Sequence, residues 1–88
     1  MTSIALPARI TMGEARAALA DISPRLAAAD APVLDASALV ELDSAALALL
    51  LDCRRQVLAR GATLQISGAS PKLRQLAALY GVGELLGL

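Results

Sequence analysis

The stretch of sequence that decides the fold runs from residue 31 to residue 51 and reads APVLDASALVELDSAALALLL. Its first part, Ala31–Asp35, is a short apolar run bounded by charge, which is typical of a buried strand that emerges into a loop. The loop continues to Asp43. A nearly uninterrupted helical pattern follows over Ser44–Arg60, and Gly61 ends it as a C-cap. The stretch therefore predicts a buried strand, a loop and a long helix.

The residues upstream predict a strand and a first helix. Ser3–Leu6 alternates weakly and ends at Pro7, which favours a strand at or near a sheet edge because proline cannot donate to a ladder. Thr11 and Glu14 form a capping box, in which the Thr11 side chain accepts from the Glu14 amide and the Glu14 side chain returns to the Thr11 amide. Pro24 either kinks the helix that follows or opens a second short segment. The buried stripe of this helix is expected at Ala15, Ala18, Leu19, Ile22, Leu26 and Ala29.

The residues downstream predict a third strand and a third helix. Ala62–Ser67 alternates as a strand, Ser70 and Pro71 cap and open a helix, and Gly81 ends it. Val82–Leu88 is expected to form a turn or short helix on the core. The inner faces are expected at Ala46, Leu47, Leu50, Cys53, Val57 and Leu58 of the long helix and at Leu73, Leu76, Ala77 and Tyr80 of the last one.

Strand and helix thus alternate three times, which is the pattern of right-handed crossovers in a mainly parallel sheet. We expect an α/β fold with three to four strands and with helices mostly on one face of the sheet. A chain of 88 residues, 57% hydrophobic and 18% charged, is expected to be one small domain over residues 1–88. Such a domain has little room for a deep substrate pocket.

The composition argues against most catalytic chemistry. The chain has no His and one Cys, which excludes Ser-His-Asp triads and the usual zinc sites. We therefore expect no catalytic residue, no metal and no cofactor. The eight basic and eight acidic residues cancel, so no net field attracts nucleic acid, and Tyr80 alone cannot form a stacking platform.

The mean hydropathy of +0.62 invites a comparison with membrane proteins. However, the longest stretch without charge is Gly61–Pro71, whereas a spanning helix needs about 20 apolar residues. No basic segment followed by an apolar one opens the chain, and a single Cys cannot form an internal disulfide. The sequence therefore predicts a cytoplasmic protein.

The deciding stretch resembles the signature of STAS domains, in which a central strand ends in Asp and an Asp-Ser/Thr-x-Gly-Leu motif opens the next helix. Asp35 matches the strand end, and Asp43–Leu47 matches the motif. The resemblance covers almost the whole chain, because Gly61, Ser67–Gly68 and Leu79–Gly81 also fit the family pattern. It implies a small STAS-like domain that binds proteins and does not catalyse a reaction.

Two features depart from the family pattern. Ala46 stands where the motif has glycine, and only Met1 and Thr2 precede the strand that corresponds to the family's second strand. An edge strand without its neighbour presents unpaired backbone groups. A partner or a second copy of the protein could cover this edge, so a homodimer through the exposed sheet edge is one expectation.

Within the family, the chain is most similar to the small STAS subunit of Mla-type ABC transporters, which binds the cytoplasmic ATPase and supports phospholipid trafficking and outer-membrane lipid asymmetry. This likeness implies an ATPase partner and a cytoplasmic position at the inner membrane, reached only through that partner. The alternative is an anti-sigma factor antagonist, in which the residue after the motif Asp is phosphorylated by its partner kinase. Ser44 occupies that position, and its residue type fits both branches.

Helix physics makes the start of the long helix a candidate binding site. The first amides of a helix lack intrahelical partners and the dipole there is positive, so a phosphate or an acidic partner is favoured near Ser44. Asp43 could orient Ser44, coordinate a kinase-bound cation or act as the N-cap itself. At 100 degrees per residue, one side of the helix opposite its apolar arc carries Ala45, Ala48, Asp52, Arg55 and Ala59. Small side chains there either allow a partner to approach closely or reflect helix propensity alone.

Overall fold

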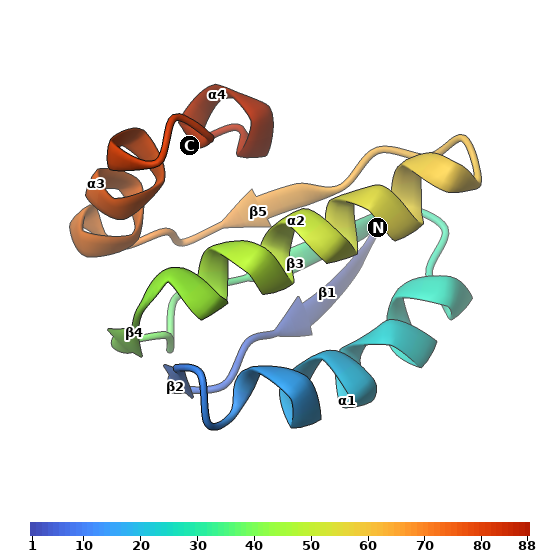
Figure 1. Ribbon diagram of the computed structural model, residues 1–88. Helices are drawn as coiled ribbons and strands as arrows, with labels where there is room; N and C mark the ends of the chain where they lie inside the picture. Colours follow the sequence, from blue (N-terminus) through green and yellow to red (C-terminus); the bar gives the residue numbers. More distant parts are fainter.

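The computed structural model describes residues 1–88 and shows strand and helix alternating as the sequence predicted (Figure 1). The bounds of the elements are β1 Thr2–Ala5, β2 Arg9–Ile10, α1 Ala15–Ala28, β3 Pro32–Asp35, β4 Glu41–Leu42, α2 Ser44–Ala59, β5 Gln65–Ser67, α3 Pro71–Leu79 and α4 Gly83–Leu86. The short helix α4 confirms the expectation of a terminal turn or helix.

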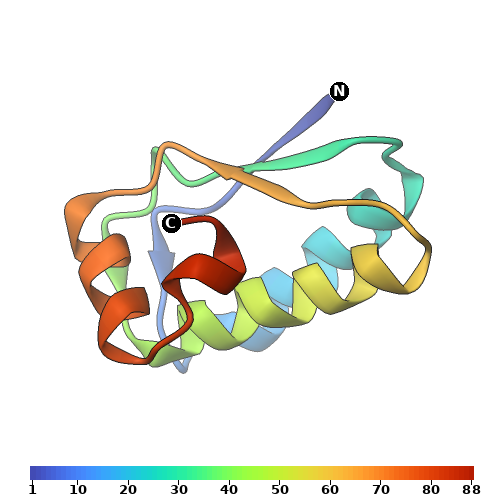
Figure 2. The same cartoon turned by 90° about the horizontal axis from the view of Figure 1, so that it is seen from above.

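The three longer strands form a parallel sheet in the order β1-β3-β5. Ile4, Leu34 and Ile66 lie in register across the sheet. All four helices lie on the same side of this sheet, while no helix covers its other side (Figure 2). The expected α/β class, parallel sheet and one-sided helix layer are confirmed, and β1 is an edge strand as the proline after it suggested.

A second, two-stranded sheet was not predicted. Strand β2 pairs in parallel with β4, with Arg9 opposite Glu41 and Ile10 opposite Leu42. These strands have two residues each, too few to show an alternating pattern, and β4 lies inside the segment expected to be a loop. Because Ile10 and Leu42 are buried, the small ladder fixes the chain just before α1 and α2 begin.

The core lies between the sheet and the helices and contains 18 buried residues. Most of them are positions that the helix and strand patterns predicted, including Leu50 and Val57. Cys53 is also buried, and burial raises the pKa of its thiol to about 12. The thiol is therefore protonated at neutral pH and acts as a small apolar side chain.

Two assignments to the core were wrong. Leu58 is 44% exposed, whereas Leu49 is buried. The buried arc of α2 is rotated toward Leu49 because α1 packs along that side of the helix. Tyr80 is 57% exposed rather than on the inner face of α3, because the helix ends at Leu79 and the direction of the next side chain no longer follows the helical period.

Two local details also differ from the sequence analysis. Strand β5 covers only Gln65–Ser67, so residues 62–64 lie outside the ladder. Of the two alternatives for Pro24, the structure shows a single continuous helix α1 and no second segment. The Glu14 carboxylate accepts from the Thr11 amide at 3.0 Å as expected, but the Thr11 hydroxyl donates to that carboxylate instead of accepting from the Glu14 amide. No helix in the structure has the length and hydropathy that a membrane span requires.

Candidate functional site

The start of α2 is fixed by Asp43, which is its N-cap. The Oδ1 atom of Asp43 accepts from the Ala45 amide at 2.8 Å, and Oδ2 accepts from the Met12 amide at 3.3 Å. Both carboxylate oxygens are thus used to satisfy backbone donors. Of the three roles considered for Asp43, the structure supports capping.

Ser44 is the first residue of α2 and is exposed. Its hydroxyl makes none of the side-chain hydrogen bonds of the structure, because the neighbouring Asp43 already caps the helix. The side chain is therefore free to contact a partner or to be modified without breaking an internal contact.

A shallow groove of about 250 Å³ runs between α1 and α2. Most of its lining is small or apolar, and Arg16 and Asp52 are the two charged residues along it. The lining residues are Ala15, Arg16 and Leu19 of α1 with Ala45, Ala48, Leu49 and Asp52 of α2. The groove thus lies along the helix whose first residue is Ser44, and it offers an apolar strip beside the two charges.

Polar contacts hold the two walls of this groove together along their length. At one end is the contact between Asp43 and Met12. Farther along, the Gln56 side-chain amide donates to the Ser23 hydroxyl at 3.0 Å. At the other end the Arg60 guanidinium donates to the carbonyls of Leu26 and Ala29. The groove is therefore formed in advance of any binding, which lowers the entropic cost of association.

Of the two charged residues that line the groove, only Asp52 has an ion-pair partner within the chain. Asp52 is half-buried, lies 3.6 Å from the Arg55 guanidinium and accepts from Gln56 at 3.4 Å. Arg16, in contrast, forms none of the four ion pairs of the structure. The α1 wall therefore carries a cation that no acidic side chain of this chain neutralises.

The structure brings together most, but not all, of the predicted site residues. Ala45, Ala48 and Asp52 line the groove, and Ser44 begins the helix that forms one wall. Ala45 and Asp52 are half-buried rather than fully outward, because α1 flanks α2 on their side. Arg55 is exposed and lies outside the groove, although it contacts Asp52.

Sequence reasoning missed the contribution of α1. Arg16 had no assigned role, and Ala15 and Leu19 were assigned to the core alone. Met12 is 82% exposed, and its backbone is held beside the Asp43 cap. The sequence shows a large apolar residue just before a helix, but it does not show that this residue is exposed or that its backbone lies beside the start of α2.

Asp35, at the end of β3, has a structural role. Its carboxylate accepts from the Ser37 amide at 3.0 Å, and this hydrogen bond holds the pKa of Asp35 below its ordinary value of 3.8. Gly68 lies against the same turn with a φ of +69°, and a Cβ at that position would be 3.0 Å from the Ser37 backbone nitrogen. Asp35 and Gly68 therefore help to pack the turn that follows β3 against the turn that follows β5.

Comparison with known families gives one finding for almost the whole chain. The family model described as "Mlab, STAS domain" matches residues 2–87. No curated protein matches the chain.

Proposed function

Because the chain belongs to the STAS domain family, whose members are in general binding and regulatory domains without catalysis, we propose that it is the subunit that binds and supports the cytoplasmic ATPase of an Mla-type ABC transporter. In this role it would serve phospholipid trafficking and outer-membrane lipid asymmetry. The observation that carries the proposal is the preformed apolar groove along helix α2. The first residue of this helix is the exposed Ser44.

The shape of the groove favours a helix or a loop of the ATPase as the bound element. Ala45 and Ala48 keep the α2 wall low, so a partner backbone can approach closely. Apolar side chains of the partner would cover the half-buried Leu19 and the exposed Ala48, and burial of this surface would supply most of the binding free energy.

The unpaired positive charge of Arg16 favours a partner that places an acidic residue in the groove. Arg16 lines the groove without an ion-pair partner, so a carboxylate of the ATPase placed beside it would form a charge-assisted contact. Through the ATPase the protein would be held at the inner membrane without contacting lipid itself.

A second candidate function is that of an anti-sigma factor antagonist. It is favoured by the state of Ser44, which is exposed at a helix N-terminus and makes no side-chain hydrogen bond. A kinase could reach this hydroxyl, and a phosphate there would lie at the positive end of the α2 dipole. It would also bring nearly two negative charges into any interface at the groove.

Purification of the tagged protein from its own cells distinguishes the two functions. An ABC-type ATPase as the main co-purifying protein, with Ser44 unmodified by mass spectrometry, is the result expected for the transporter subunit. A serine kinase or anti-sigma factor as the main partner, with phosphoserine at position 44, would overturn the first proposal in favour of the second.

A further inference from the structure

Helices α1 and α2 run side by side in the same direction (Figure 1). The hydrogen bonds that link these two segments join residues 31 to 34 positions apart in the sequence, from the start of the helices to their ends. A nearly constant offset shows that the two helices stay in register along their length. The groove between them is therefore a channel whose two walls run parallel.

The residues that line the groove recur at helical spacing. Those of α2 are Ala45, Ala48, Leu49 and Asp52. The last three lie three, four and seven positions after the first, which is the spacing of one face of a helix. At a rise of about 1.5 Å per residue, this wall is about 10 Å long and covers two helical turns.

Helical walls offer no main-chain partner to a segment bound between them. Inside a helix each amide already donates to the carbonyl four residues earlier. An extended segment or a loop buried in the groove would lose its hydrogen bonds to water and would find no replacement. A helix satisfies its own amides and carbonyls, so it is buried there without this loss of hydrogen bonds.

We propose that the groove binds an amphipathic helix of the partner, packed as a third helix against α1 and α2. This inference rests on the proposed function, in which the groove is the binding site, and it identifies the element that occupies it. The small side chains of Ala45 and Ala48 let the helix axes approach to about 8 Å, the short end of the usual range. Apolar side chains that recur every three or four residues along the bound helix cover Ala48 and the half-buried Leu19.

The charges of the two walls determine which flank of the bound helix is acidic. On the α2 wall, Asp52 already has the Arg55 guanidinium at 3.6 Å. On the α1 wall, Arg16 is exposed and forms none of the four ion pairs of the structure. A carboxylate on the flank that faces α1 therefore pairs with Arg16, whereas a lysine or arginine in that place is repelled.

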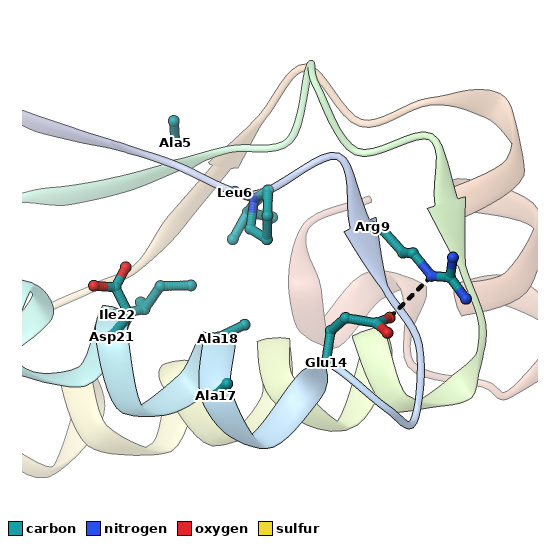
Figure 3. Close-up of a pocket in the computed structure, with 9 residues that line it drawn as sticks. Ala5, Leu6, Arg9, Glu14, Ala17, Ala18, Asp21 and Ile22 are labelled. Carbon is teal, nitrogen blue, oxygen red and sulfur yellow. Dashed lines mark hydrogen bonds and ion pairs between the residues drawn. The ribbon is translucent and has the colours of Figure 1, made fainter.

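A matched control is available on another face of α1. Ala17 is exposed and does not line the groove. It lines a separate hollow of about 510 Å³ between α1 and β1, into which Leu6 and Ile22 point (Figure 3). A cysteine at position 17 therefore reports contacts of α1 that do not involve the groove.

Disulfide scanning against the co-purified partner tests whether the bound element is a helix. Ala48→Cys places a small thiol in the groove, and Ala17→Cys is the control. The native Cys53 does not compete, because it is buried and its pKa is raised to about 12. Single cysteines are introduced in turn along the surface segments of a partner that has been freed of its own reactive cysteines.

The expected result is a cross-linking yield with Ala48→Cys that peaks every three or four residues along one helix of the partner, and no such pattern with Ala17→Cys. Yields that peak at every second residue, yields confined to a loop, or no cross-link in an intact complex would overturn the proposal. The identity of the partner is read separately. A partner other than an ABC-type ATPase with the same helical period would overturn the proposed function and support this inference.

Charge reversal tests the acidic flank. Arg16→Glu is expected to weaken binding of the partner about tenfold. Reversal of the acidic residue on the cross-linked helix to arginine is expected to restore binding to Arg16→Glu and to weaken binding to the wild type. If no acidic residue of that helix restores binding when reversed, the assignment of a carboxylate to Arg16 is wrong.

Discussion

The carboxylate of Asp43 holds the backbone of Met12, which lies 31 residues earlier, by a hydrogen bond of 3.3 Å. The same carboxylate caps α2 through the Ala45 amide. One side chain therefore fixes the start of α2 and the segment that leads into α1. These two helices form the walls of the proposed binding groove, so its geometry depends on Asp43 although Asp43 is not among the residues that line it.

Asp43→Ala is expected to lower the free energy of unfolding by about 1 to 2 kcal/mol, because it removes an N-cap and leaves the Met12 amide without its acceptor. Urea denaturation measures the change. Ser44→Ala is the matched control, and since the Ser44 hydroxyl caps nothing, its effect should stay within about 0.5 kcal/mol. Equal losses in the two variants would mean that both side chains cap the helix.

Leu50→Ala is expected to cost about 2 to 5 kcal/mol, because Leu50 is fully buried and its truncation leaves a cavity between α2 and the sheet. Leu58→Ala, on the same helix, removes a side chain that is 44% exposed and should cost less than about 1 kcal/mol. Denaturation midpoints of the two variants, measured side by side, check the rotation of α2. The reverse order would place Leu58 in the core.

Acid is expected to destabilise the protein partly through Glu14. The Thr11 hydroxyl and amide, with a further contribution from Arg9, lower the pKa of Glu14 in the folded state below its ordinary value of 4.5. The unfolded chain therefore binds a proton at Glu14 more readily than the folded chain does. The stabilisation is complete well above pH 4.5 and is lost as the pH falls below that value toward the folded-state pKa.

Glu14→Gln removes this dependence on pH. Melting temperatures measured from neutral pH to about pH 3 should show a variant that is less stable than the wild type at neutral pH and falls less steeply in acid. Parallel curves for the two proteins would show that the contacts of Glu14 do not contribute to acid sensitivity.

The main layers of the fold could be predicted because their signals are local. Ala31–Asp35 and Ser44–Arg60 are long enough to show an apolar run and a helical period, and the structure places β3 and α2 there within a residue. Strands β2 and β4 have no such signal, since each has two residues whose pairing depends on a contact between distant parts of the chain.

The candidate site could be predicted only in part for the same reason. The helical period placed Ala48 on the open side of α2, and the structure shows it exposed. The period could not show that α1 packs beside this face, which half-buries Asp52 and brings Arg16 into the groove. The burial of Leu49 in place of Leu58 follows from the same packing.

The measurement that tests the central claim most directly is binding of the co-expressed transporter ATPase to the wild type, Ala48→Arg and Ala59→Arg. Both alanines are exposed on α2, but only Ala48 lines the groove. A long side chain at position 48 would fill the groove and exclude the partner sterically. Arg16→Glu, which reverses the unpaired charge of the opposite wall, provides a second variant that does not depend on Ala48. Melts of all variants are recorded alongside.

The account predicts that the wild type and Ala59→Arg retain the ATPase, that Ala48→Arg loses it and Arg16→Glu weakens it, and that all four proteins melt within a few degrees of one another. Retention of the ATPase by folded Ala48→Arg and Arg16→Glu at the wild-type level would contradict the account and move the interface away from the groove between α1 and α2.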